Sequence, residues 1–294
     1  MNLNQARPVP DREAYQFIVD NINGNSLYKK DLPVKFCSEY LEWIKSSKLN
    51  NLINLDKYKS LQFVHGTSQS FDFFYLMNHT KRFRGFKGDF MYHKIMWKRG
   101  YEWKHIEDGE LERGDAVIFS LPFSDFGDIH PRTDEILDKC DKLGVPVFLD
   151  CAYMIMARDI EFDFNRKCIQ GISFSLSKGF YGAEHLRIGL RLTKEFTDDP
   201  VEVFNDFQMI NWIGPDIGLK LINNFEHDFT QNKYYNKQIE ICKELNIKPS
   251  KCVIFGVTDE NHSDFGNNNR GTEWRRVCIS SLMGDMEDIH SKVC

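Results

Sequence analysis

The sequence predicts an α/β protein with a mostly parallel central sheet flanked by helices and a smaller second domain. The 294 residues, 41% of them hydrophobic and 28% charged, suffice for one large core and a smaller domain. Residues 132–143 have the apolar spacing of a helix that Gly144 would cap. Residues 145–149 are then apolar throughout, which is typical of a parallel-sheet strand buried on both faces.

Other segments continue this alternation of helical and extended patterns. Strands are expected at 61–64, at the end of 111–121, and at 172–176, 187–192, 251–256 and 273–280. Further helices are expected at 31–44, after residue 93 up to Gly100, at 202–212 and at 217–245. The polar residues 1–30 are expected to form an arm or loop, and the glycine-rich loop 261–271 is expected to be mobile.

Composition excludes several classes of protein. The net charge is −5 and the pI is about 6.0, and no basic stripe suggests nucleic-acid binding. No apolar run is long enough for a membrane span, and the N-terminus lacks the apolar core of a signal peptide. The eight cysteines include no Cys-x-x-Cys pair, so we expect reduced core residues in a cytoplasmic protein. The nine histidines show no metal-ligand spacing, so no metal site is expected.

Lys178 lies on a glycine-bearing turn between two predicted buried strands, an unusual place for a surface lysine. Ser175 precedes it by three residues, and Arg187 follows it by nine. A carbonyl cofactor needs a primary amine to hold it covalently, and among side chains only lysine supplies one. The alternative is a lysine that extends from a strand end, beside serines that cap a turn.

A glycine and two hydroxyl residues connect the predicted strand 61–64 to the next helix. These are Gly66, Thr67 and Ser68. Backbone N–H groups at a helix N-terminus point toward bound anions, and the hydroxyls add donors. A simple glycine turn with a serine N-cap is the alternative, and the local sequence does not separate the two.

Asp150 follows the predicted strand 145–149 directly. Open α/β sheets bind ligands just beyond the carboxyl ends of their strands, so this carboxylate is a candidate ligand-binding group. Tyr153 follows three residues later. The alternative is an aspartate that only caps a helix.

In combination, these segments resemble the cofactor-binding motifs of the pyridoxal-phosphate-dependent aminotransferases of fold type I (class I/II). Residues 66–69 resemble the family's phosphate turn, 122–127 its Pro-x-Asn-Pro-x-Gly loop and 150–153 its Asp-x-Ala-Tyr motif. Residues 175–178 match its Ser-x-x-Lys box. The resemblance covers most of the chain and implies pyridoxal 5'-phosphate as the cofactor, with a small α+β domain beside the large one.

The resemblance implies a role for each motif residue. Lys178 would form the Schiff base and then act as general base. Asp150 would pair with the protonated pyridine nitrogen, whose pKa a nearby anion raises. Tyr153 would donate to the ring oxygen of the cofactor. The phosphate would be bound by Gly66, Thr67, Ser68, Ser175 and Arg187.

Three further residues follow from the same resemblance. Phe90 is preferred over Tyr92 as the ring that stacks on the pyridine, although an aromatic in the core is the alternative for either. Ser124 stands where the family has an asparagine that donates to the ring oxygen, and serine has a shorter reach. Arg276 would bind the substrate α-carboxylate, while Arg275 would point the other way by strand alternation. The alternative for Arg276 is a surface ion pair.

The resemblance divides the chain into three parts. Residues 1–50 would form an N-terminal arm and part of the small domain, 51–215 the large cofactor-binding domain, and 216–294 an interdomain helix and the rest of the small domain. The chain is shorter than family norms, so a pared-down small domain and a more open substrate pocket are expected. A homodimer is expected too, with Tyr28 as a candidate to reach the partner's phosphate site.

The predicted function is therefore that of an aminotransferase that moves an amino group between an amino acid and a keto acid. A lyase, cyclase or other non-transaminating enzyme on the same scaffold is the alternative, since such enzymes share the cofactor-binding residues. A non-catalytic or unrelated α/β protein is the third possibility. The sequence does not name the substrate.

Overall fold

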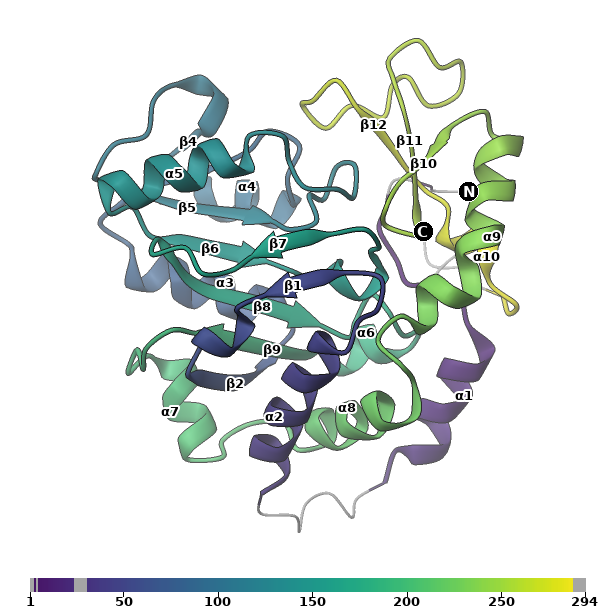
Figure 1. The fold of residues 1–294 in the computed structure, drawn as a ribbon, viewed down its shortest axis with the longest axis horizontal. Helices are drawn as coiled ribbons and strands as arrows, with labels where there is room; N and C mark the ends of the chain where they lie inside the picture. Colours follow the sequence, from purple (N-terminus) through teal and green to yellow (C-terminus); the bar gives the residue numbers. More distant parts are fainter. Residues whose placement is uncertain (1–2, 4, 24–30, 288–294) are drawn as a thin grey trace.

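The computed structural model describes residues 3, 5–23 and 31–287, and its largest element is a seven-stranded sheet (Figure 1). The strand order is β2-β9-β8-β6-β5-β3-β4. Strand β9 is antiparallel to both its neighbours, and the other neighbouring pairs are parallel. The seven strands are β2 (Ser60–His65), β3 (Arg82–Gly85), β4 (Trp103–His105), β5 (Asp115–Ser120), β6 (Val147–Asp150), β8 (Ile169–Ser175) and β9 (Ile188–Thr193). The predicted α/β class with a mostly parallel sheet is confirmed.

Helices cover both faces of this sheet and create two separate cores. Phe148 in β6 packs on one face with Phe71 and Trp97. Its neighbours Val147 and Leu149 belong to the larger core on the other face. This double burial explains why the strand is apolar throughout. The helices of this domain are α2 (Leu32–Lys45), α3 (Thr67–Met77), α4 (Met91–Trp97), α5 (Thr133–Leu143), α6 (Ala183–Leu186), α7 (Pro200–Asp206) and α8 (Ile213–Asn224).

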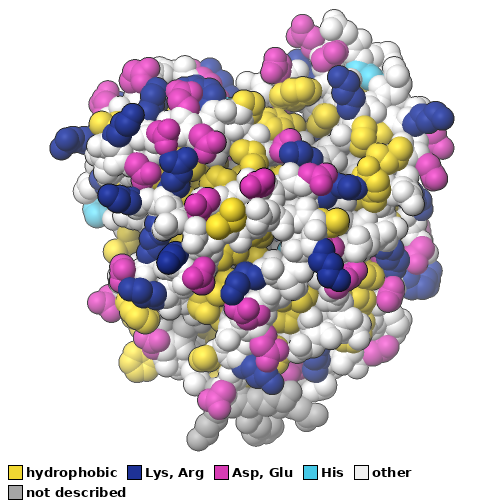
Figure 2. Space-filling model, in the orientation of Figure 1, with side chains coloured by type: hydrophobic (Ala, Val, Ile, Leu, Met, Phe, Trp, Pro, Cys, Tyr) yellow, Lys and Arg dark blue, Asp and Glu magenta, His cyan; other side chains and the backbone are white. Residues whose placement is uncertain are grey.

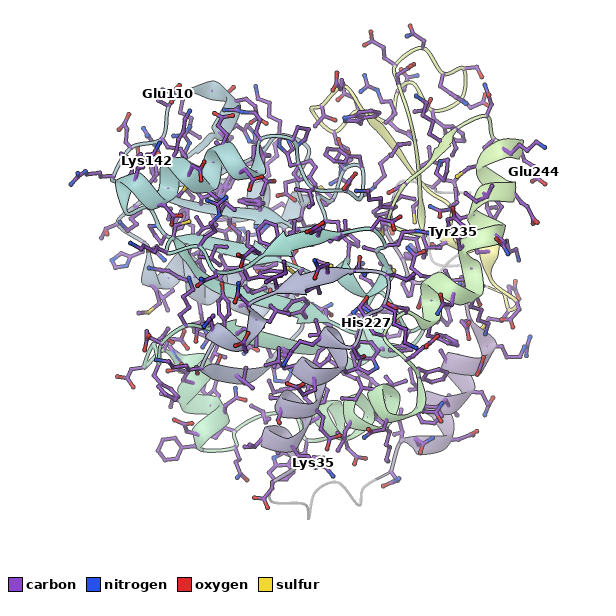
Figure 3. The ribbon with its side chains drawn as sticks, in the orientation of Figure 1. Lys35, Glu110, Lys142, His227, Tyr235 and Glu244 are labelled. Atoms are coloured by element: carbon purple, nitrogen blue, oxygen red, sulfur yellow. The ribbon has the colours of Figure 1, made fainter. Side chains whose placement is uncertain are left out.

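Most charged residues of the helices lie on the surface, although Glu202 on α7 and Asp216 on α8 are buried. Figure 3 shows this for Lys35 on α2 and Lys142 on α5, and both side chains are exposed. No helix among the described residues has the length and apolarity that a membrane span requires. The seven cysteines in the described ranges are buried free thiols.

A smaller antiparallel sheet lies beside the large one (Figure 1). Its strands are β10 (Lys248–Pro249), β11 (Phe255–Thr258) and β12 (Arg275–Cys278), and α9 (Phe229–Glu244) and α10 (Ser280–Met283) accompany it. The N–H of Cys278 donates to the carbonyl of Leu3 (2.7 Å), and that of Asp285 to the carbonyl of Pro10 (3.1 Å). The N-terminal segment therefore packs against the small C-terminal sheet.

Minor elements complete the fold. A two-stranded parallel ribbon pairs β1 (Asn51–Ile53) with β7 (Glu161–Asp163). The short 3₁₀ helices are η2 (Leu55–Lys57), η3 (Ile106–Asp108) and η4 (Met154–Met156). The domain boundaries at residues 50 and 215 stay predictions.

The expected N-terminal loop and the expected helix 202–212 were both wrong in part. The N-terminal region contains the helix α1 (Arg12–Asn21), which Asp11 caps by accepting the N–H of Ala14 (2.9 Å). Helix α7 ends at Asp206 because Gln208 has a positive φ of 57°. A left-handed residue cannot continue a right-handed helix.

The expected long helix 217–245 is two helices, α8 and α9, with a break between them. In the break, Asp228 accepts hydrogen bonds from the Ser47 hydroxyl (2.8 Å) and the Lys48 N–H (2.7 Å). These contacts fix a turn that local spacing does not reveal. The expected strand 251–256 begins only at Phe255, because Ser250 accepts the N–H of Cys252 (3.0 Å) in a tight turn before it.

Candidate active site

Asp150 lies at the carboxyl end of β6 and is 3% exposed. Its Oδ1 accepts the N–H of Ala152 (3.0 Å). Burial raises the pKa of this carboxyl to about 7, against the lowering effect of that N–H. Asp89 raises the same pKa, while a hydrogen bond from Thr67 and the charge of Lys178 lower it. The fold therefore brings Thr67 and Lys178 near enough to Asp150 to influence its pKa, while the roles of the three residues stay predictions.

Lys178 lies on the turn after β8 and is half-buried. Its Nζ donates a hydrogen bond to the carbonyl of Ala6 (2.7 Å). Burial lowers the pKa of the amine below its ordinary value, and the charges of Arg276 and Arg187 lower it too. A lowered pKa is what a nucleophilic or basic lysine requires at neutral pH.

The predicted anion turn is built from Gly66, Ser68 and Arg187. Gly66 has φ +74°, and a Cβ there would lie 2.4 Å from Nη2 of Arg187. That Nη2 donates to the Ser68 hydroxyl (2.9 Å). Only glycine fits this backbone conformation and close approach. Thr67 follows as the first residue of α3, so the helix N-terminus and a guanidinium meet at one place.

Ser175 is buried at the end of β8, and its hydroxyl is engaged within the lysine turn. Its Oγ accepts the N–H of Ser177 (3.1 Å) and lies 3.2 Å from the carbonyl oxygen of Ile188. Ser175 therefore helps to hold the turn that carries Lys178. Its contact with a phosphate stays a prediction.

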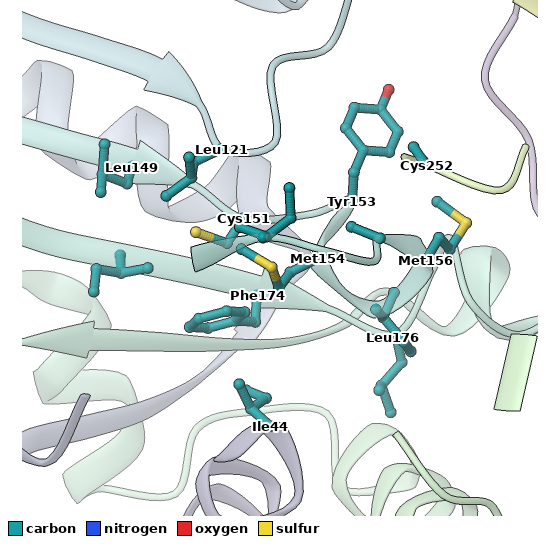
Figure 4. Close-up of a cluster of buried hydrophobic side chains, with 14 of the residues drawn as sticks. Ile44, Leu121, Leu149, Cys151, Tyr153, Met154, Met156, Phe174, Leu176 and Cys252 are labelled. Carbon is teal, nitrogen blue, oxygen red and sulfur yellow. The ribbon is translucent and has the colours of Figure 1, made fainter. Parts of the chain in front are cut away.

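Tyr153 follows β6 by three residues, and its hydroxyl points away from the hydrophobic cluster around Cys151 and Met154 (Figure 4). Its ring makes a T-shaped contact with Phe255 of the small domain (5.3 Å between centroids). Burial raises its pKa to about 12, although the charge of Arg276 opposes the shift. The phenol thus stays protonated at neutral pH and can donate a hydrogen bond between the two domains.

Asp89 is a site residue that the sequence analysis missed. Its carboxylate accepts hydrogen bonds from Ser120 N (2.9 Å), Ser120 Oγ (2.5 Å) and Ser124 Oγ (3.0 Å). The hydroxyl of Ser124, expected to donate to a cofactor oxygen, therefore donates to this carboxylate. No motif marks Asp89, because its role depends on β3 and β5 lying side by side.

Arg276 reaches across to the large domain. Its Nη1 donates to the carbonyl of Ser124 (2.6 Å), and its guanidinium lies over the ring of Phe255 (4.7 Å). Arg275 donates instead to the carbonyls of Gly266 (2.7 Å) and Thr272 (2.8 Å). The two arginines point to different sides, as expected of neighbours in a strand.

Arg270 was also missed by the sequence analysis. It pairs with Asp125 (3.1 Å) and donates to the carbonyls of Gly88 (3.0 Å) and Asp89 (3.1 Å). Thr272 donates its hydroxyl to Asp125 as well. These contacts anchor the 261–271 loop to the large domain. A lone arginine in a polar loop gives no local signal of such a contact.

Phe90 precedes α4 and is 37% exposed. It stacks on Tyr92 (6.0 Å, 16° between ring planes), whose hydroxyl donates to Asp72 (2.5 Å). Phe90 lines a cavity between the two domains, and Tyr92 does not. The preference for Phe90 as the ring that stacks on the cofactor stays a prediction. Tyr28 lies outside the described residues.

No protein-family model and no curated protein matches the chain, whereas many solved structures do. One is an alanine aminotransferase from Pyrococcus furiosus (12% identity, 98% of this chain and 88% of the other, TM-score 0.66). Another is an L-threonine-O-3-phosphate decarboxylase from Porphyromonas gingivalis (13% identity, 95% of this chain and 94% of the other, TM-score 0.62). A third is a tyrosine aminotransferase from Leishmania infantum (13% identity, 94% of this chain and 87% of the other, TM-score 0.62).

The chain therefore has the fold of the pyridoxal-phosphate-dependent aminotransferases, as predicted. The likenesses extend over nearly its whole length, so the large sheet and the small domain both have counterparts in these structures. At this level of identity the comparisons establish the fold and not the activity.

Proposed function

We propose that the protein is a pyridoxal-phosphate-dependent aminotransferase that moves an amino group from an amino acid to a keto acid. The observation that carries this proposal is the meeting of Asp150 and Lys178 at the carboxyl ends of β6 and β8. A buried carboxylate and a half-buried amine are costly at a site with no charged ligand. Burial lowers the pKa of Lys178, as a nucleophilic amine requires, and raises that of Asp150 to about 7, so that Asp150 needs a cationic partner to stay ionised.

The residues present fit the cofactor. Gly66, Ser68 and Arg187 form a cradle that a Cβ at residue 66 would fill, and its donors suit a phosphate. Asp150 has no ion-pair partner among the described residues, which suits a protonated ring nitrogen. Pyridoxal phosphate, when bound, supplies an aldehyde for a covalent bond to Lys178 and a ring that takes up electrons from the substrate.

Lys178 would have two roles. Because its pKa is lowered by burial, more of its amine is neutral and nucleophilic at neutral pH than in an exposed lysine. After the amino-acid substrate replaces Lys178 on the cofactor, the free amine would take the proton from the substrate α-carbon. It would then return this proton to the cofactor carbon. The Ala6 carbonyl holds the amine in position before that exchange.

Asp150 would keep a proton on the ring nitrogen. Its burial raises its own pKa to about 7 without a ligand, and a cationic ring nitrogen beside it would favour the ionised form. Tyr153 would donate to the ring oxygen, while Phe90 would cover the ring. Arg276 would bind the α-carboxylate of the substrate, beside the Ser124 carbonyl that it already contacts.

A homodimer is part of the proposal. Large apolar side chains are exposed on and around α7, namely Phe196 (75%), Phe207 (74%) and Met209 (66%). Figure 2 shows hydrophobic surface at the lower left, where Figure 1 has α7. Exposed apolar clusters of this kind mark interaction surfaces in soluble proteins. We propose that a second copy of this chain covers the apolar surface around α7.

A lyase on the same scaffold is the second candidate, and one observation favours it. Ser124 donates to Asp89, so the hydrogen-bond donor that aminotransferases direct at the ring oxygen is engaged elsewhere. The decarboxylase from Porphyromonas gingivalis has the same fold at a similar TM-score. Both candidate activities use Lys178 and Asp150 in the same way.

The experiment that separates them is a single-turnover reaction of cofactor-loaded protein with a panel of amino acids. A transaminase converts its bound cofactor to the amine form, releases a keto acid and then stops until a keto acid acceptor is added. The proposal predicts that renewed turnover requires this acceptor. Continuous turnover without it, with release of carbon dioxide or an eliminated group, would instead support the lyase.

A further inference from the structure

A cavity of about 640 Å³ lies between the two domains. Its large-domain wall comes from residues 85–91 and from α4, and its small-domain wall from residues 267–271 and Arg276. Arg276 is the proposed binding group for the substrate α-carboxylate. A substrate held there would extend its side chain into this cavity, so the lining of the cavity decides which side chain fits.

The charged residues of the large-domain wall already make contacts of their own. The ammonium of Lys87 pairs with the carboxylate of Asp108 (2.6 Å). The carboxylate of Asp89 accepts hydrogen bonds from two serine hydroxyls (2.5 and 3.0 Å). Lys94 is an exposed residue of α4, where water screens its charge. A charged group of a substrate would therefore have to compete with contacts that exist already.

The small-domain wall also offers little charge to a substrate side chain. Residues 267–269 are three asparagines, whose amides are uncharged. Arg270 pairs with Asp125 (3.1 Å) and donates to the carbonyl of Gly88 (3.0 Å). Burial lowers the pKa of Arg270, whereas the charges of Asp125 and Asp89 raise it. The charges of Arg270 and Asp89 thus compensate each other within the protein, and a further ion brought between the walls would be costly to bury.

Apolar side chains supply accessible surface in the same cavity. Phe90 is 37% exposed and Met91 is 66% exposed, and both line it. Phe86 and Trp97 line it as well, although they are almost fully buried. One face of the Phe90 ring stacks on Tyr92 (6.0 Å between centroids, 16° between planes). Aromatic and aliphatic walls around a space of this size are typical of sites for apolar ligands.

We infer that this cavity binds the side chain of the amino-acid substrate and that this side chain is an uncharged aromatic ring. The inference rests on the proposed function, because it takes Arg276 as the anchor of the α-carboxylate. The edge of Phe90 meets the substrate ring, since one face is stacked on Tyr92 and the other is proposed to cover the cofactor. Edge-to-face contacts of this kind attract aromatic rings beyond their burial. Met91 adds an apolar contact, and Asp89 repels side chains that end in a carboxylate.

The test is titration calorimetry on the full chain, with and without pyridoxal phosphate. The probes are amino-acid analogues that lack the α-amino group and differ in their side chains. They are 3-phenylpropionate (aromatic), 4-methylpentanoate (branched), glutarate (acidic), 5-aminopentanoate (basic) and propionate (small). The inference predicts that 3-phenylpropionate binds roughly tenfold more tightly than each of the others, or better. It is overturned if another probe binds as tightly as 3-phenylpropionate, or if 3-phenylpropionate does not bind.

Two variants of exposed side chains locate the effect in cofactor-free protein. Phe90→Leu removes the ring but keeps an apolar side chain, so the affinity for 3-phenylpropionate should fall roughly fivefold while that for 4-methylpentanoate is unchanged. Phe196→Leu is its control, since Phe196 is 75% exposed and does not line the cavity. Met91→Ala should weaken both bulky probes roughly threefold and leave propionate unchanged. Met77→Ala is its control, at 55% exposure on α3. Equal effects of a variant and its control would contradict the assignment.

The failure of this inference is distinguishable from the failure of the proposed function. If pyridoxal phosphate becomes attached to Lys178 and the probes bind equally, the function stands and the aromatic assignment is wrong. If no cofactor binds but 3-phenylpropionate is still preferred, the proposed function is wrong and the aromatic selectivity of the cavity stands.

Discussion

The side-chain amine of Lys178 donates a 2.7 Å hydrogen bond to the backbone carbonyl of Ala6, 172 residues earlier in the chain. The same N-terminal segment is tied to the small domain, where Cys278 donates to the carbonyl of Leu3 (2.7 Å). The segment therefore connects the lysine turn of the large domain to β12. Because the bond is to a backbone carbonyl, it holds the amine without adding a charge that would raise its pKa.

The first prediction concerns the reactivity of Lys178. Burial lowers its pKa from the ordinary 10.5, so its neutral form is present at lower pH than in an exposed lysine. We expect the rate of its covalent attachment to pyridoxal phosphate to reach half its maximum below pH 10.5. Borohydride trapping at a series of pH values, followed by peptide mass spectrometry, measures this. The exposed Lys35 in the same chain is the internal control, and identical profiles for the two lysines would contradict the prediction.

The second prediction concerns the stability of cofactor-free protein. The pKa of Asp150 is raised from 3.8 to about 7 by burial, so between these values the unfolded chain has lost a proton that the folded chain keeps. The free energy of unfolding should therefore fall as pH rises from about 4 to 7, on the order of 4 kcal/mol from this group alone.

Asp150→Asn should remove that slope, because asparagine does not titrate. Urea unfolding measures the free energy of unfolding of the wild type and of the variant at pH 5 and at pH 8. The difference between the two proteins at each pH isolates the contribution of Asp150. The variant should gain about 4 kcal/mol of stability relative to the wild type at pH 8 and less than half of that at pH 5. The same difference at both pH values would show that Asp150 is not the group responsible.

The third prediction tests the anion turn. Gly66→Ala places a Cβ 2.4 Å from Nη2 of Arg187 in a backbone with φ +74°. We expect the affinity for pyridoxal phosphate to fall at least tenfold, because the backbone at residue 66 would be strained by about 1–3 kcal/mol and the guanidinium of Arg187 would be displaced. Gly100→Ala is the matched control, since its φ is +109° and its Cβ meets nothing within 4 Å. Equal losses of affinity in the two variants would mean that the turn does not hold the phosphate.

The fourth prediction tests the proposed dimer. Phe207→Glu puts a charge in the apolar surface around α7 and should weaken dimerisation at least tenfold, because a charge is costly to bury in an interface. Val34→Glu is the control, since Val34 on α2 is exposed to a similar extent, 73% against 74%. Light scattering with size-exclusion chromatography measures the mass. A monomeric wild type, or dimers that resist both substitutions, would refute the assignment.

The strands at the centre of the fold could be predicted because a strand that is buried on both faces is apolar at every position. β6 is the clearest example, since Phe148 faces one core and Leu149 the other. The break between α8 and α9 could not be predicted in this way. It depends on contacts between Asp228 and the segment at Ser47, 181 residues away in the chain.

The residues of the candidate site also fall into two groups, those that local motifs predict and those that only the assembled fold reveals. Asp150, Lys178 and Gly66 stand in local motifs whose spacing has a chemical reason, so the sequence alone indicates them. Asp89 and Arg270 contribute through contacts between the large domain and the loop of the small domain, and each lies in an unremarkable stretch. Their roles follow from the assembled fold and not from the residues around them.

The central claim is that Lys178 holds pyridoxal phosphate covalently. Its most direct test is mass spectrometry of the wild type and of Lys178→Ala after incubation with the cofactor and reduction with borohydride. The claim predicts one reduced cofactor per wild-type chain, on the peptide that contains Lys178, and none on the variant. No adduct on the wild type, or an adduct of equal yield at another lysine in both proteins, would contradict it.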